Sequence, residues 1–575
     1  MKKGIMCALA AVFLLTVTST LWAGGGSQSG GASGNATVDR SNFNALGTYP
    51  LVKNKDTITV LTIANSLNTD LNQYYMTGWY EDKTNVHVAW QYAPEESFKE
   101  RVNLALASGE KIDLILGYPW GASGFTQAEM LKFATQRLIC PIGDYFDSDT
   151  INIKKNLDSV DGFRAALTQP DGKIYSIPDL EECLHCAYYG KLWVNKIFLK
   201  NVGINKYPET LDEFKAMLIA FRDKDANGNG DPNDEIPMLG TAEPGTYSSR
   251  VDTYLMMTFG VYDDGLNRLY LDNKTVKAAY QQPNFREGLK YLNDLSKQGL
   301  ISRDSFSISL DQRARINSQK YESIVGVIPY EHMYNLGTRE PGQPVRWVDY
   351  EAIPPLKGQY GQLARYDPYL KFRVLLCGSM VPITCKNPAL VARWLDYFHT
   401  WEGTLMTQFG GKGIGWDDAD PNGIGAGGTK ATFKTYNLQP NDKWYNKNQW
   451  PFVPSFRRYS FWQGWQQSSD PLAPDGSGAE GYLYQITEKN YQPYGNPSYA
   501  IPPLWYSPAD ASDMALLTTN INTYVEESIA KFIVGDMDPN KDSDWNSFQT
   551  QLKNLDIDRY LQIIQKTYNA SAFNK

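Results

Sequence analysis

Three β-rich runs near the start of the chain, separated by helical patterns, constrain the fold most strongly. The runs cover residues 57–63, 86–90 and 112–116. Val86, Val88 and Trp90 alternate with polar residues, as in a strand with one buried face. Before the third run, apolar residues recur at helical spacing from Phe98 to Leu106, where Gly109 ends the helix. This β-α-β-α-β order predicts an α/β fold with a parallel sheet between helices.

Residues 1–23 are typical of a secretory signal peptide. Lys2 and Lys3 precede an apolar run, residues 5–17, that is too short to span a membrane. We expect cleavage after Ala23 and an exported protein, periplasmic or extracellular. No cysteine follows at the cleavage point, so a lipid anchor has no acceptor there. Residues 24–55 are expected to be a flexible tether, because their Gly-, Ser- and Ala-rich start cannot bury enough surface to fold.

Charge and motif content narrow the classes of function. The formal net charge is −8, and no basic patch of the kind that nucleic-acid binding requires is present. None of the four histidines is paired at metalloprotease spacing, and neither a Gly-x-Ser-x-Gly elbow nor a phosphate-binding glycine loop occurs. We therefore predict that the protein is not an enzyme. A glycoside hydrolase with two facing carboxylates is the one enzymatic alternative left open.

A loop rich in hard oxygen ligands indicates a calcium site. Residues 225–235 match positions 1, 3, 5, 6, 7 and 9 of an EF-hand loop, with Gly230 at the turn, but Ile236 replaces the glutamate of position 12. The candidate ligands are Asp225, Asn227, Asn229, Asp231, Asn233, Asp234 and Glu235. The alternative is a polar turn without a metal. Because the loop follows a helix that Thr210 and Glu213 can cap, we expect structural calcium that fixes the end of this helix.

The cysteines point to structure rather than catalysis. Five remain after cleavage, an odd number that leaves at least one free thiol in an exported protein. Cys183 and Cys186 have redox-motif spacing around His185, but the residues that follow resemble a strand and not the helix that would activate a thiol. A local disulfide or two buried thiols are the favoured alternatives, ahead of redox or zinc chemistry.

Aromatic residues provide the positive functional signal. They make up 13% of the chain, with 37 Tyr and 15 Trp, and many stand in polar, turn-rich surroundings. Tyr and Trp offer an apolar face and a polar edge, which suits the C–H face and the hydroxyls of a sugar ring. We therefore expect an aromatic-lined carbohydrate site.

The order of several short segments resembles one family, the extracellular solute-binding proteins of carbohydrate ABC importers, and within it the large subgroup that binds oligosaccharides. The resemblance covers nearly the whole mature chain. The matching segments are residues 81–86, 103–109, 171–178, 192–196, 210–214, 225–237, 387–388, 393–396 and 531–535. Some members carry a structural calcium in the Asp-x-Asn-x-Asn-Gly loop. Here the pair Asp234-Glu235 stands one position later than in the family, which leaves open whether Asn233 or Asp234 is a ligand.

The resemblance implies two α/β lobes with a ligand cleft between them, joined by crossing strands. We expect the N-terminal lobe at residues 56–185 and 355–410, and the C-terminal lobe at 188–352 and 411–575. The expected partners are a carbohydrate, which we expect to be an oligosaccharide, and a membrane ABC permease. The protein itself is expected to be a monomer. A peptide-binding or sensor-coupled protein of the same fold is the main alternative.

The candidate ligand-binding residues come from two kinds of position. Loops after first-lobe strands face the cleft, because α/β sheets bind ligands beyond the carboxyl ends of their strands. These loops nominate Asn65, Ser66, Tyr118 and Trp120. The chain crossings and the second-lobe loops add Glu182, His185, Tyr247, Tyr330 and Trp416.

Overall fold

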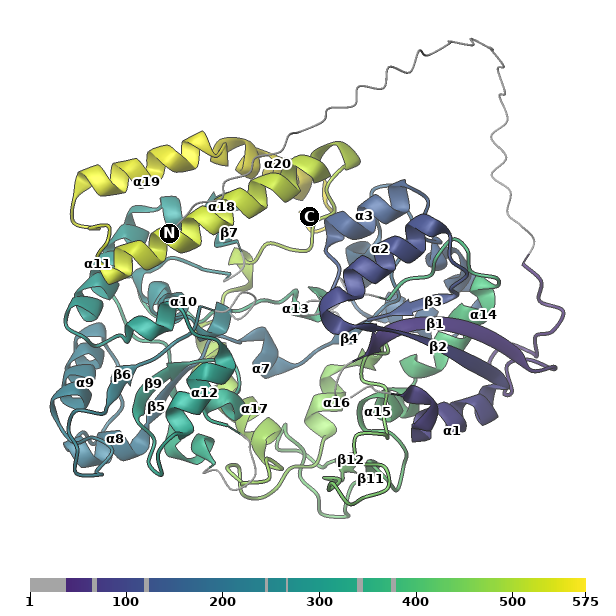
Figure 1. Cartoon of the computed structure of the whole chain (residues 1–575), viewed down its shortest axis with the longest axis horizontal. Helices are drawn as coiled ribbons and strands as arrows, with labels where there is room; N and C mark the ends of the chain where they lie inside the picture. Colours follow the sequence, from purple (N-terminus) through teal and green to yellow (C-terminus); the bar gives the residue numbers. More distant parts are fainter. Residues whose placement is uncertain are drawn as a thin grey trace, which may run out of the picture. The chain divides into compact units, whose positions relative to one another are not determined.

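The first sheet has β1 (Asp56–Ala64) at its centre, parallel to β2 (Val86–Pro94) on one side and to β3 (Leu114–Leu116) on the other. The computed structural model describes residues 38–64, 70–117, 124–242, 247–264, 267–338, 345–373 and 379–574. The parallel sheet predicted from the three β-rich runs is therefore confirmed. Helices α1, α2 and α14 lie beside this sheet in Figure 1.

Helices cover both faces of the first sheet. They are α1 (Tyr75–Thr84), α2 (Phe98–Ser108), α3 (Gln127–Thr135), α4 (Phe146–Asp149), α5 (Asn152–Ser159), α6 (Phe163–Leu167), α14 (Pro388–Asp396) and α15 (Trp401–Phe409). On one face Phe98 and Phe133 pack with Leu61 in a single buried cluster. On the other, the Tyr80 hydroxyl donates to the carbonyl of Trp394, and the two rings meet edge to face at 5.3 Å. The predicted cap of α14 is confirmed, because the Asn387 side chain accepts from the Leu390 amide.

The second sheet has the strand order β10-β5-β9-β6. Its strands are β5 (Leu192–Asn195), β6 (Ile236–Met238), β9 (Val325–Pro329) and β10 (Tyr350–Ile353). Strand β5 is antiparallel to both neighbours, whereas β6 and β9 are parallel. Its core is a separate buried cluster from that of the first sheet. Two sheets with two cores are what a two-lobed protein requires.

Most remaining helices pack around this second core. They are α8 (Lys196–Val202), α9 (Leu211–Asp223), α10 (Val251–Met256), α11 (Pro283–Lys297), α12 (Leu310–Ser318), α17 (Ala479–Asn490), α18 (Pro508–Val534), α19 (Asp542–Asn554) and α20 (Ile557–Ala570). A hairpin, β7 (Leu269–Asp272) and β8 (Thr275–Ala278), lies among them. Thr210 caps α9 as predicted, by accepting from the Glu213 amide.

A small aromatic cluster follows α15 in the chain. It is built from β11 (Trp416–Asp418), the antiparallel β12 (Phe433–Thr435) and α16 (Tyr459–Gly464). Trp450, between β12 and α16, packs on Trp394 and Trp90 of the first lobe. The lobe boundary expected at residue 411 stays a prediction, but these contacts favour a first lobe that continues beyond it.

The start of the described chain corrects the predicted tether. Phe43 and Val52 pair and are buried, and Arg40 forms an ion pair with Asp149 at 2.6 Å. Residues 40–55 are therefore packed, because buried apolar side chains and this ion pair compensate their ordering. No helix among the described residues has the length and apolar character needed to cross a membrane.

Candidate functional site

Two short strands join at the point where the chain passes between the two cores. Strand β4 (Leu180–Glu181) pairs in parallel with β13 (Phe456–Arg457). Nη2 of Arg457 lies 3.1 Å from Glu181 and 3.8 Å from Asp179, and all three side chains are largely buried. Burial raises the pKa of Asp179 to about 6, although the Arg457 charge opposes the shift. Buried ion pairs thus hold the two crossing strands together, in addition to their backbone pairing.

Glu182, a predicted ligand residue, links three segments at this junction. Its Oε2 accepts from Nε of Arg458 at 2.6 Å and from the Tyr459 amide at 3.2 Å. Its Oε1 lies 3.9 Å from Nζ of Lys371 in α13 (Leu370–Arg373). Both arginines are therefore paired, Arg457 of β13 with two buried acids and Arg458, the next residue, with Glu182. Each arginine charge is thus balanced by at least one carboxylate of the crossing segment.

His185, also predicted, shares one carboxylate with a second histidine. Its Nε2 lies 2.9 Å from Oε2 of Glu480, and Nε2 of His332 lies 3.7 Å from Oε1. Burial alone would raise the pKa of Glu480, but the two imidazoles outweigh it and hold the pKa well below its usual range. Burial is also the main cause that lowers the pKa of His332. Glu480 stands in the first turn of α17, where a negative charge is favoured by the helix dipole.

A cavity of about 330 Å³ opens beside Glu480. Its lining residues are Tyr334, Lys434, Thr435, Trp465, Gln466, Gln467, Ser468, Gly476, Ser477 and Glu480. Two aromatic rings stand among amides, hydroxyls and one carboxylate, which is the mixture that a sugar requires. Lys434 is already paired with Asp420 at 2.6 Å. The sequence analysis missed this set. Its only local signal is the Gly- and Ser-rich turn before α17, which does not say what the turn lines.

The segment after β4 differs from the sequence expectation. Cys183 and Cys186 form a disulfide, so the local-disulfide alternative is the one found. The bridged residues form a single helical turn, α7 (Leu184–Ala187), which the sequence did not predict, whereas the residues that follow include strand β5 (Leu192–Asn195), as expected. His185 lies near both sulfurs, but the disulfide leaves them without thiolates for a metal.

Lys191 places a buried ammonium next to this turn. Its Nζ donates to the carbonyls of His185, at 3.0 Å, and Tyr188, at 2.8 Å. Burial lowers the pKa of Lys191 to about 7, while the charges of Glu331 and Glu480 oppose that shift. The side chain therefore fixes the backbone that carries His185.

Two predicted ligand residues belong to packed cores instead. Tyr330 is 6% exposed, with the Arg313 guanidinium over its ring and Asn335 donating to its hydroxyl. Trp416 is 4% exposed and packs with Phe433 and Phe461. Their burial favours packing roles, and their ligand roles stay predictions, because an aromatic in a turn-rich sequence does not reveal which side it faces. Asn65, Ser66, Tyr118 and Trp120 lie outside the described residues, as does the side chain of Tyr247.

The predicted metal loop connects α9 to β6 and draws its polar side chains inward. The Asp225 carboxylate accepts from the amides of Gly228, Asn229 and Gly230. Nδ2 of Asn227 and Nδ2 of Asn229 each donate to Asp234 at 2.8 Å. Lys320 pairs with the same carboxylate. Three nitrogen donors thus converge on the Asp234 carboxylate. A bound cation would be attracted by this same carboxylate.

The Glu235 carboxylate indicates whether the loop fits a metal ion. Oε1 of Glu235 accepts from the amides of Ala226 and Asn227, whereas Oε2 is buried without a hydrogen-bond partner among the described residues. Burial raises the pKa of Glu235. An orphaned carboxylate oxygen beside hard oxygen donors fits calcium, which takes about 6–8 such ligands. By contrast, Asn233 bonds within the loop only to Asp231, so the convergence favours Asp234 over Asn233.

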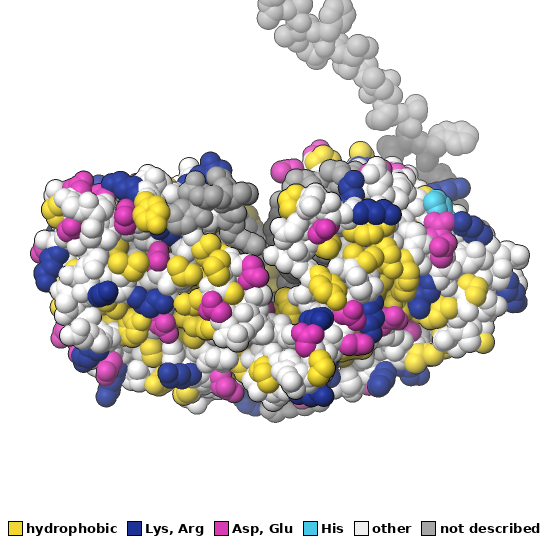
Figure 2. All heavy atoms as spheres, turned by 90° about the horizontal axis from the view of Figure 1, so that it is seen from below, with side chains coloured by type: hydrophobic (Ala, Val, Ile, Leu, Met, Phe, Trp, Pro, Cys, Tyr) yellow, Lys and Arg dark blue, Asp and Glu magenta, His cyan; other side chains and the backbone are white. Residues whose placement is uncertain are grey.

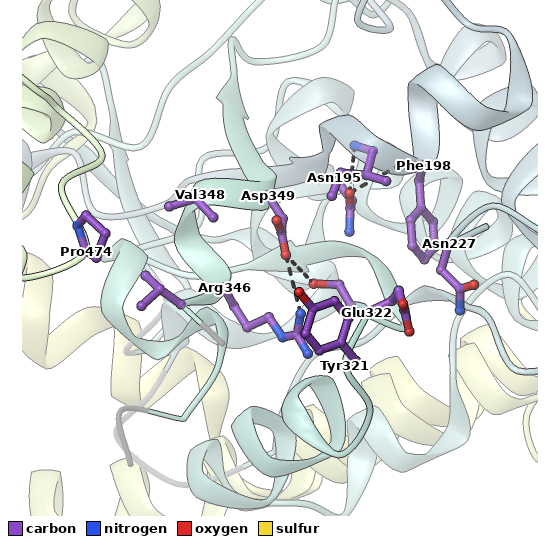
Figure 3. Close-up of a pocket in the computed structure, with 12 residues that line it drawn as sticks. Asn195, Phe198, Asn227, Tyr321, Glu322, Arg346, Val348, Asp349 and Pro474 are labelled. Atoms are coloured by element: carbon purple, nitrogen blue, oxygen red, sulfur yellow. Dashed lines mark hydrogen bonds and ion pairs between the residues drawn. The ribbon is translucent and has the colours of Figure 1, made fainter. Parts of the chain in front are cut away.

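A second cavity, of about 300 Å³, lies next to the metal loop (Figure 3). It is lined by Asn227 of the loop and by Phe198, Tyr321 and Glu322. Asp349 in its wall is satisfied by Ser323 at 2.8 Å and Arg346 at 3.6 Å. This cavity shares no lining residue with the one beside Glu480. The predicted metal loop therefore contributes no residue to the cavity beside Glu480.

Comparison with known proteins finds one family that matches part of the chain and a relative that matches most of it. The family model described as "Bacterial extracellular solute-binding protein" matches residues 65–322. The fructooligosaccharide ABC transporter substrate-binding protein FusA of Streptococcus pneumoniae serotype 4 is 26% identical over 551 residues, which is 92% of this chain and 93% of FusA.

Two solved structures share the fold over almost the whole chain. S. pneumoniae FusA in complex with kestose has a TM-score of 0.72 at 24% identity, covering 90% of this chain and 100% of that one. A FusA EF-hand mutant in complex with fructo-nystose has a TM-score of 0.72 at 23% identity, with the same coverage. Both structures are described as those of a substrate-binding protein of an ABC transporter. The chain is therefore similar to bacterial extracellular solute-binding proteins over residues 65–322, and it shares the two-lobed α/β fold of these solved structures.

Proposed function

We propose that the protein captures an oligosaccharide, with fructooligosaccharides as the first class to test, and delivers it to a membrane ABC permease. The observation that carries the proposal is the likeness to a fructooligosaccharide-binding protein along 92% of the chain. The cavity beside Glu480 supports it, because Tyr334 and Trp465 can face sugar rings while Gln466, Gln467 and Glu480 accept or donate to hydroxyls. Glu182 and His185 stay in the proposed site, together with Asn65, Ser66, Tyr118, Trp120 and Tyr247.

Titration calorimetry with kestose, a maltooligosaccharide and a short peptide tests this function. Kestose is expected to bind without being consumed. Trp465→Ala should weaken binding about tenfold, or about 1.4 kcal/mol, because it removes the ring wall of the cavity. Trp401→Ala is the matched control, since Trp401 is exposed and lines no part of this cavity. Binding of the peptide alone would favour the peptide-binding alternative, and release of reducing ends would favour a hydrolase.

We also propose a structural calcium ion in the 225–235 loop. Asp225, Asn227, Asn229 and Asp234 would hold it, with Asp231, Asn233 and Glu235 as the further candidates. The EF-hand mutant of FusA supports a functional loop of this type in a relative. When bound, calcium would supply a fixed charge that ties the end of α9 to β6. The ion has no part in ligand capture in this proposal.

Export completes the proposal. The predicted signal peptide, residues 1–23, would be removed, leaving a monomer that works at the outer face of a membrane. Figure 2 shows charges of both signs interspersed over one face of the molecule, which suits a protein without a nucleic-acid partner. For the lobes we propose the predicted ranges, with the first lobe extended to about residue 455 on the contacts of Trp450.

A further inference from the structure

The charges around the cavity beside Glu480 are distributed unevenly. Arg457 and Arg458 are neutralised by Asp179, Glu181 and Glu182. Lys434, the single cation that lines the cavity, is held by Asp420. Glu480 is the single anion in the lining, and 19% of its side chain stays accessible.

Two histidines that do not line the cavity stabilise the ionised form of Glu480. Its two oxygens face His185 at 2.9 Å and His332 at 3.7 Å. The rings of the two histidines lie 5.8 Å apart in an edge-to-face arrangement, and that of His332 rests against Tyr334. The carboxylate is therefore oriented by residues of α7 and of the segment after β9. Each oxygen still has lone pairs for further donors, since a carboxylate can accept about four hydrogen bonds.

A ligand next to this carboxylate meets two opposite effects. Sugar hydroxyls can donate to a fixed anion, and such charge-assisted bonds are about twice as strong as neutral ones. A sugar carboxylate would instead face a like charge, and among the described lining residues the one cation, Lys434, is already paired with Asp420. In a partly desolvated site, a like charge at close range costs far more than it does in water.

We propose that Glu480 is the charge-selective residue of the site, which accepts hydrogen bonds from hydroxyls of a neutral oligosaccharide and excludes uronate-containing oligosaccharides. Trp465 and Tyr334 would contact sugars of either kind, because a ring face does not distinguish charge. Selectivity is thereby assigned to one side chain and aromatic contact to its neighbours. This inference rests on the proposed oligosaccharide binding and extends it to the ligand's charge.

The test compares kestose with a trigalacturonate by titration calorimetry at pH 7.5. The native protein should bind the trigalacturonate at least 100-fold more weakly than kestose. Glu480→Gln should weaken kestose binding at least tenfold and narrow the ratio between the two ligands at least tenfold. Glu488→Gln, an exposed position on the same helix, is the matched control and should behave as the native protein.

Several outcomes overturn the inference. Equal affinity of the native protein for both ligands would do so, as would an unchanged ratio in Glu480→Gln. If that variant does not fold, the native protein is titrated at low and high salt: repulsion predicts that salt strengthens trigalacturonate binding and leaves kestose unaffected. No salt effect would then contradict the inference. Failure of both ligands to bind would instead contradict the proposed function.

Discussion

His399 lies buried behind β13, and its burial makes the protein sensitive to acid. Asn156 donates to its carbonyl at 2.9 Å, and its ring lies 6.3 Å from Phe456. Burial lowers the pKa of His399 from 6.5 to about 3. The unfolded chain takes up this proton near pH 6.5 and the folded chain does not until about pH 3. The free energy of unfolding should therefore decrease as the pH is lowered from about 6.5 to about 3, by up to about 1.4 kcal/mol per pH unit.

Urea unfolding between pH 7 and pH 4.5 measures this slope at the scale of one residue. His399→Phe should reduce this slope by up to about 1.4 kcal/mol per pH unit, because the variant has no imidazole to protonate at this position. Trp401→Ala is the control, because it changes an exposed side chain that does not titrate, and it should leave the slope as it is. Asp179, whose raised pKa acts in the opposite direction, is present in all three proteins, so the difference reports His399. Equal slopes in the native protein and His399→Phe would refute the assignment.

Single residues also show where sequence reasoning reaches its limit. Arg457 and Arg458 are chemically identical in the sequence, yet one is buried between two acids and the other pairs with Glu182 at the surface. Trp416 and Trp465 both stand in turn-rich segments, but only Trp465 lines the cavity. The sequence predicts aromatic residues in abundance, whereas their direction depends on partners far along the chain.

At the scale of elements, the crossing strands depend on buried ion pairs. Arg457→Met should lower the free energy of unfolding by about 3 kcal/mol, because it leaves Asp179 and Glu181 buried without a counter-charge. Arg458→Met removes the adjacent pair, which is 40% exposed on the arginine side, and should cost about 1 kcal/mol or less. Chemical denaturation of the two variants compares them directly. If both variants lose the same free energy of unfolding, burial does not determine how much each ion pair stabilises the protein.

The loop between α9 and β6 carries the calcium prediction. Saturating calcium at 100 times its Kd should add about 2.7 kcal/mol to the free energy of unfolding, and a chelator should remove it. Asp225→Asn should abolish most of this gain. Asp223→Asn, an exposed acid of α9 paired with Arg222, is the matched control and should retain it. A melting temperature that ignores both calcium and chelator, together with a metal-free elemental analysis, would disprove the site.

Local and distant elements differ in how far the sequence predicts them. The caps of α9 and α14 follow from Thr210 and Asn387, because a cap involves residues within one turn. The pairing of β4 with β13 joins residues 276 positions apart, from Leu180 to Phe456, and each strand has only two residues. Such short strands leave no periodic pattern. The sheet of the first lobe was predictable, but the junction that positions Glu182 and His185 was not.

At the scale of the whole molecule, two separate cores meet through few elements. Glu182 in the crossing segment contacts Arg458 and Lys371, and Trp505 donates to the Ala166 carbonyl of α6 at 2.8 Å. The cavity beside Glu480 is bounded by Tyr334, from the segment after β9, and by Lys434 and Trp465, near the small aromatic cluster. A ligand that contacts both sides would favour the arrangement in which they lie closest, since it can shift an equilibrium only by its differential affinity.

Ligand binding should therefore close the molecule, and solution scattering can measure the change. We expect the radius of gyration to fall when kestose is added at saturation, because hinge closure around a ligand brings the lobes together. Trp465→Ala at the same kestose concentration should show a smaller fall, in proportion to its lower occupancy. Trp401→Ala should follow the native protein. If calorimetry shows a saturated site while the radius of gyration stays constant, the lobes do not close on the ligand, and capture would have to proceed in a preformed cleft.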